Sequence, residues 1–102
     1  MGAALLAEPV TARDAAAWGM IWQAVPDADF AAAVAARASQ LAQGPTTSYR
    51  LIKQALRASL GNSLSDQLAL EARLQAEAAA TRDFREGVLA FLEKRPPRYR
   101  GA

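Results

Sequence analysis

The sequence predicts a mainly α-helical chain of about five helices with one short β segment at residues 20–25. Alanine, the strongest helix former, occupies 26 of the 102 positions. Glycines, prolines and capping residues then divide the chain into pieces of helix length. The apolar, β-prone run at residues 20–25 ends at Pro26 and predicts a brief buried strand. The length is that of one domain, so we expect residues 1–102 to form a single helical unit.

The first helix is expected over residues 12–18. Thr11, followed three residues later by Asp14, resembles a capping box with a shorter acid. Gly19 can adopt the left-handed conformation that commonly ends a helix, so the helix should stop there.

The second and third helices are separated by a Gly-Pro pair. Asp27 or Asp29 is expected to cap an alanine-rich second helix that ends at Gly44. Pro45 suits the first turn of a helix and should open the third one, which ends at Gly61.

The last two helices also begin at capping residues. Asn62 or Ser63 is expected to cap the fourth helix, which reaches about Ala80. Thr81 should cap the fifth helix, which runs to Arg95 and is stopped by the Pro-Pro pair that follows.

Two of these helices carry a stripe of larger apolar residues at helical spacing, which is typical of a buried face. In the third helix the stripe is Tyr49, Ile52, Leu56 and Leu60. In the fifth it is Phe84, Val88, Phe91 and Leu92. Because alanine buries little surface, we expect the chain to need a companion domain or a second copy.

Charge is unevenly distributed within the net +2. Residues 1–44 hold two bases against four acids, whereas residues 45–102 hold ten bases against six. An excess of bases towards the C-terminus favours phosphates as binding partners. The alternative is that these bases are only solvated and bind nothing. The densest basic cluster is Lys94, Arg95, Arg98 and Arg100.

The composition excludes several chemistries. The chain has no Cys and no His, so thiolate or imidazole metal sites and cysteine or Ser-His-Asp catalysis are excluded, and we expect no metal site. No apolar run approaches the length of a membrane span, and the N-terminus does not resemble a signal peptide. We therefore expect a cytoplasmic protein without a membrane partner.

Two single residues stand out within their predicted helices. Glu71 lies between two pairs of leucines, so it is either paired with Arg73, Arg82 or Arg85 or is a site carboxylate with a raised pKa. Gly87 lies in mid-helix, where it costs about 1 kcal/mol relative to alanine. We expect another backbone to approach it closely.

Several segments together resemble the C-terminal portion of the crotonase superfamily, the enoyl-CoA hydratase/isomerase enzymes. ALLAEPVTARDAAAWGMIWQAVPDADF (residues 4–30) and LAQGPTTSYRLIKQAL (41–56) are moderately specific. TRDFREGVLAFLEKRPPRYRG (81–101) matches the usual ending of these enzymes. With SLGNSLSDQLALEARLQ (59–75), the pattern looks closest to the phenylacetate-degradation isomerases that act on ring-epoxide CoA thioesters. The resemblance implies the C-terminal helical region of the ClpP/crotonase-like fold.

The resemblance implies two CoA-contacting residues and no catalytic residue. Phe91 matches a family position that packs near the adenine, and Lys94 matches one that approaches the CoA phosphates. An aromatic face and an ammonium suit these roles. The alternatives are that Phe91 packs in the core with its stripe and that Lys94 is a solvated cation.

The resemblance also implies what the chain lacks. Family members are longer, and their N-terminal spiral domain supplies the oxyanion hole and the acid/base carboxylates, neither of which has a motif here. We therefore expect residues 1–102 alone to be inactive and to bind no cofactor, with a CoA thioester as the substrate of the full-length parent. A homo-oligomer, a trimer or dimer of trimers, is expected for the parent.

Two other classes of function compete with this interpretation. A freestanding helical module could oligomerise through its alanine and leucine faces. A nucleic-acid binder could use the basic stripe of the third helix, Arg50, Lys53 and Arg57. The net charge of +2 is far below that of a typical nucleic-acid footprint, so we expect no nucleic-acid partner.

Overall fold

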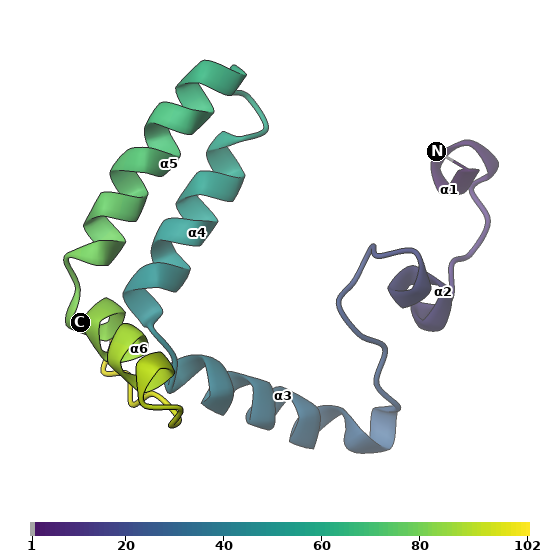
Figure 1. Cartoon of the computed structure of the whole chain (residues 1–102). Coiled ribbons are helices and arrows are strands. Elements are labelled where there is room, and N and C mark those ends of the chain that lie inside the picture. Colours follow the sequence, from purple (N-terminus) through teal and green to yellow (C-terminus); the bar gives the residue numbers. More distant parts are fainter. Residues whose placement is uncertain (1) are drawn as a thin grey trace. The chain divides into compact units, whose positions relative to one another are not determined.

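A computed structural model describes residues 2–102 and shows six helices in that range (Figure 1). The mainly helical class is confirmed, but the number of helices is six rather than five. The additional helix is the five-residue α1 at the N-terminus. The helices are α1 (Gly2–Leu6), α2 (Ala12–Ala17), α3 (Asp27–Ala42), α4 (Thr46–Ala58), α5 (Leu64–Ala79) and α6 (Arg82–Leu92).

The contacts of the chain group into two compact units, one up to Ala36 and the other from Arg37 to Ala102. The boundary falls within α3. Among residues 2–36 no side chain is buried, whereas the second unit contains every buried residue of the described chain. None of the helices in residues 2–102 is long and apolar enough to cross a membrane.

The short strand predicted at residues 20–25 is wrong. The amides of Met20 and Ile21 both donate to the carbonyl of Ala15 and so finish the turn that follows α2. No other strand exists in residues 2–102 to pair with this segment, and a lone strand would leave its backbone groups without partners. Trp22, which we expected to be buried, is 86% exposed.

Three of the predicted helix starts are confirmed by side-chain caps. The hydroxyls of Thr11, Ser63 and Thr81 accept hydrogen bonds from the amides three residues later, at 3.1, 3.2 and 3.0 Å. Of the two candidates for the fourth predicted helix, Ser63 is the cap. Each bond satisfies one of the free amides in the first turn of its helix.

Two other predicted starts differ from the structure. Asp27 and Asp29 lie inside the first turn of α3 instead of before it, where their charge complements the helix dipole. Pro45 is the residue before α4 rather than its first turn, and its carbonyl accepts from the Tyr49 amide.

The core of the second unit lies where α4 and α5 pack side by side and α5 continues into α6 (Figure 1). Its buried apolar residues are Leu51, Leu74 and Ala90. In α4 the inward face is therefore that of Leu51. The predicted stripe faces outward, since Ile52, Leu56 and Leu60 are all exposed.

The same inversion occurs in α6. Its buried residues are Asp83 and Ala90, which lie two turns apart on a small and polar face. The larger apolar stripe of Phe84, Val88, Phe91 and Leu92 is exposed. Both stripes have the predicted spacing but are mostly exposed; the exception is Tyr49, which is partly buried and packs against Gly44.

Candidate functional site

The candidate site lies at the C-terminal end of α6, which carries Phe91 and Lys94. The helix ends three residues earlier than predicted, and Lys94 adopts a left-handed conformation with φ 53°. Its amide donates to the Phe91 carbonyl and the Arg95 amide donates to the Ala90 carbonyl. These two bonds define a Schellman motif, which sharply turns the chain away from the helix.

Phe91 is 82% exposed, so it does not pack in the core of this chain. It lines an open cleft of about 390 Å³ together with Phe84, Val88, Gly87 and Tyr99. The cleft is mostly apolar and suits a flat ring better than a charged group. Lys94 does not line this cleft; it is exposed on the turn just beyond it.

The C-terminal tail, residues 95–102, folds back along α6 and is fixed there by Asp83. This carboxylate is 3% exposed and accepts hydrogen bonds from the Arg100 amide at 2.8 Å and the Gly101 amide at 2.7 Å. The Asp83 amide donates in return to the carbonyl of Ala102. Thr47, in the first turn of α4, donates its hydroxyl to the Gly101 carbonyl. The tail therefore joins α6 to α4.

Glu86 fixes the other end of the tail. It accepts from the Arg95 guanidinium at 2.6 Å and from the Arg98 amide at 2.8 Å. The hydrogen bond from Arg95, followed by that from the Arg98 amide, lowers the pKa of Glu86 from 4.5 to about 2. The same ion pair raises the pKa of Arg95 further. Both groups therefore stay charged at neutral pH.

The close approach predicted at Gly87 is present, but the neighbour is a side chain rather than a backbone. A Cβ placed on Gly87 would lie 3.3 Å from the Tyr99 hydroxyl oxygen. The tail thus packs its aromatic ring across α6 at the one position without a side chain.

Of the two alternatives for Glu71, pairing with Arg73, Arg82 or Arg85 does not occur in the described residues. Glu71 is exposed and accepts from the Gln67 side-chain amide at 2.7 Å instead. The buried carboxylate of the chain is Asp83. From the sequence, Asp83 was expected only in the first turn of a helix. The signal that could have indicated its importance is that Asp83 belongs to the segment matching the usual ending of the family.

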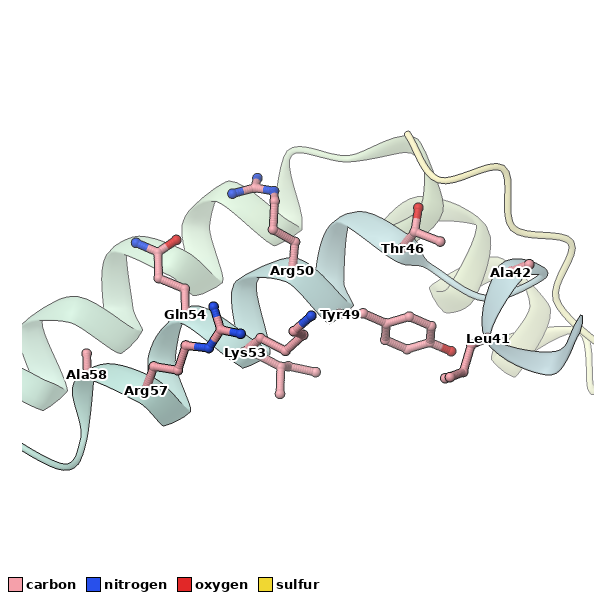
Figure 2. Close-up of a pocket in the computed structure, with 10 residues that line it drawn as sticks. Leu41, Ala42, Thr46, Tyr49, Arg50, Lys53, Gln54, Arg57 and Ala58 are labelled. Atoms are coloured by element: carbon pink, nitrogen blue, oxygen red, sulfur yellow. The ribbon is translucent and has the colours of Figure 1, made fainter. Parts of the chain in front are cut away.

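The basic stripe of α4 borders a second cleft, of about 1120 Å³, which Figure 2 shows from the side of Tyr49 and Lys53. Arg50, which also lines the cleft, forms an ion pair with Glu77 of α5. Lys53 and Arg57 form no ion pair within residues 2–102. Leu41, Ile52 and Tyr49 supply an apolar part of the lining.

Residues 2–102 contain no group of three metal-ligating side chains. The three carboxylates at α6 are all occupied, Asp83 by backbone amides and Glu86 and Glu93 by Arg95. What the end of α6 offers chemically is an exposed aromatic ring and an exposed ammonium three residues further along the chain.

The described chain is thus all-helical, with an exposed aromatic residue and an exposed cation at the end of α6. Comparison with known proteins specifies the class, because the Enoyl-CoA hydratase/isomerase family matches residues 1–102. The chain therefore belongs to the enoyl-CoA hydratase/isomerase, or crotonase, family.

Individual relatives agree with this assignment. The chain is 55% identical over 101 residues to the "Probable enoyl-CoA hydratase" of Rhodobacter capsulatus and 46% identical to the 1,2-epoxyphenylacetyl-CoA isomerase of Escherichia coli. A crystal structure of an enoyl-CoA hydratase/isomerase from Mycobacterium abscessus superposes with a TM-score of 0.87 at 33% identity.

The alignments cover nearly all of this chain but less than half of each relative. The alignments include 99% of this chain for the first two relatives and 98% for the crystal structure. They include only 39%, 38% and 39% of those proteins, respectively. The chain thus spans about two fifths of the length of the relatives it matches.

Proposed function

We propose that this chain is the assembly and CoA-contacting region of an enoyl-CoA hydratase/isomerase, acting on CoA thioesters once it is joined to the rest of the family fold. The observation that carries the proposal is the 82% exposure of Phe91 on a helix that ends in a fixed turn. A phenyl ring left in water without a partner is unfavourable, whereas adenine stacking would cover it.

Lys94 complements this ring. The Schellman turn sets the lysine one turn beyond Phe91, at the negative end of the α6 dipole. An ammonium there suits the phosphates that adjoin the adenosine of CoA. The rival role of Phe91 in a core is disfavoured by its exposure within this chain.

The outward stripes of α4 and α6 support a role in assembly. Ile52, Leu56, Phe84 and Val88 are between 44% and 64% exposed. Contiguous apolar surface of this kind marks a docking face. We propose that copies of the chain and the remaining part of the family fold cover it, giving the trimer or dimer of trimers expected of the family.

The parent reaction is proposed to be the hydration or isomerisation of a CoA thioester through a stabilised enolate. The likeness to the E. coli isomerase supports a place in phenylacetate degradation. The 102 residues alone are proposed to be inactive, since removing even one oxyanion-hole donor typically costs about 100- to 1000-fold in rate.

The site is tested in a chimera of the R. capsulatus relative whose matching segment is replaced by this chain. Phe91→Ala and Lys94→Gln should each raise the KM for an enoyl-CoA about tenfold with little change in kcat, because each removes ground-state binding. Phe30→Ala, an exposed phenylalanine of α3, is the matched control and should leave KM unchanged. Unchanged KM in both site variants would contradict the proposal.

The assembly role is tested on the 102-residue chain by light scattering. We expect self-association at micromolar concentration, which Leu56→Glu should abolish because it places a charge on the outward stripe of α4. Gln54→Glu adds the same charge elsewhere on that helix and should have no such effect. A wild-type monomer would refute the assembly part, and crotonyl-CoA turnover by the chain alone would refute its predicted inactivity.

A further inference from the structure

A third cleft, of about 650 Å³, is formed where the tail crosses α6 and is lined mainly by arginines. We call it the arginine cleft. Its lining residues are Arg82, Asp83, Glu86, Arg95, Pro96, Arg98 and Arg100. Four cations and two carboxylates give the lining a net charge of +2. Neither Phe91 nor Lys94 belongs to it.

Both carboxylates of the arginine cleft are already engaged. Asp83 is occupied by the Arg100 and Gly101 amides, and Glu86 by the Arg95 guanidinium and the Arg98 amide. The guanidinium groups of Arg82, Arg98 and Arg100 form no ion pair within residues 2–102. Unpaired like charges in one cleft repel each other, so the arrangement favours a bound anion.

The arginines of the tail are also preorganised. The Arg98 and Arg100 amides donate to Glu86 and Asp83, so the backbone beneath both side chains is fixed to α6. Both residues line the same cleft. Arg82 approaches from the first turn of α6. Less ordering is therefore required when a ligand binds than in a loose basic terminus.

We propose that the arginine cleft binds a phosphate-bearing anion. Guanidinium forks match phosphate oxygens in geometry as well as in charge. Pro96 is the one apolar residue of the lining, and the lining has no aromatic ring. The cleft therefore recognises the phosphate groups of its ligand rather than a base or an acyl chain, and a diphosphate suits three unpaired cations best.

The test is calorimetric titration of the 102-residue chain with inorganic diphosphate at low ionic strength, where screening is weak. Saturable binding is expected. Arg98→Gln with Arg100→Gln should weaken it at least about tenfold, because charge-assisted bonds are lost. Glutamine keeps the backbone amides that fix the tail. The matched control, Lys53→Gln with Arg57→Gln, removes the same charge from α4 and should change the affinity less than about twofold.

If the double variant fails to fold, Arg82→Gln provides a second test, because Arg82 lies outside the tail. This variant should also weaken diphosphate binding. Competition by CoA would identify a CoA phosphate as the source of the anion, and its failure to compete would identify a free diphosphate-type anion. Absence of saturable diphosphate binding, or an equal loss in the Lys53/Arg57 control, would overturn the proposal. Neither result depends on Phe91 or Lys94, so the proposed CoA contact is judged separately.

Discussion

The ends of α2 and α6 use the same backbone motif with different residues. After α2, Gly19 is left-handed with φ 74°, its amide donates to Ala16 and the next amide donates to Ala15. After α6, Lys94 takes the equivalent position at φ 53°. Glycine adopts this conformation freely, whereas a residue with a Cβ is strained by about 1–2 kcal/mol.

What differs between the two ends is the chain that follows. After Gly19 the chain continues into exposed residues of a unit that buries no side chain. After Lys94 the tail is fixed by Glu86, Asp83 and the packing of Tyr99 on Gly87. A local preference decides the first end, and tertiary contacts impose the second against local preference.

The largest effect is expected from releasing the tail. Asp83→Ala leaves the Arg100 and Gly101 amides without their acceptor, and should lower the free energy of unfolding by about 2–4 kcal/mol. Thermal unfolding measures this, and hydrogen exchange should show faster exchange of both amides. Asp66→Ala is the control, because Asp66 is also a first-turn acid but is exposed. Equal losses in the two variants would mean that the tail contacts add nothing.

A smaller effect on stability is expected from exchanging the residue types at positions 19 and 94, with opposite signs at the ends of α2 and α6. Gly19→Ala should destabilise the end of α2 by about 1–2 kcal/mol because alanine is strained at this φ. Lys94→Gly should stabilise the end of α6 by about 0.5–1 kcal/mol by relieving the same strain. Hydrogen exchange of the Met20 and Arg95 amides reports each end. Destabilisation by Lys94→Gly would show that the lysine side chain itself supports the fold.

The smallest effect is expected from acid. Because the Arg95 contact lowers the folded-state pKa of Glu86 to about 2, its stabilising contribution is complete above the ordinary value of 4.5 and is lost as the pH falls towards 2. Wild-type protein should therefore have a higher Tm than Glu86→Gln at pH 6, and the difference should shrink between pH 4.5 and 2. A difference independent of pH would assign the effect to packing.

Capping and turn chemistry made much of the fold predictable. Thr11, Ser63 and Thr81 cap the helices for which they were predicted, and Gly19 ends α2. These signals act over three or four residues, so the sequence contains them in full. The strand at residues 20–25 failed because a strand requires a partner, which local sequence cannot guarantee.

The candidate site was only partly predictable. Phe91 and Lys94 were named by resemblance, and their CoA contacts stay predictions. Periodicity found the apolar stripe of α6 but not its direction, since Asp83 and Ala90 face the core instead. The tail was expected to be a basic terminus, and its arginines do remain outside, but its backbone is bound to α6. No local pattern links residues 17 or 18 positions apart.

By itself the sequence determined five of the six helices, three of their caps, the uneven charge and the family ending, because each depends on neighbours along the chain. Only the tertiary structure decided which helix faces pack, that Asp83 is buried, that Lys94 is left-handed, and that Arg82 joins the tail arginines around one cleft. The physical reason is that these features depend on residues far apart in the chain: the tail is held by hydrogen bonds to Asp83 and Glu86, and Leu51 and Leu74 fill the core while the larger apolar stripes stay mostly exposed.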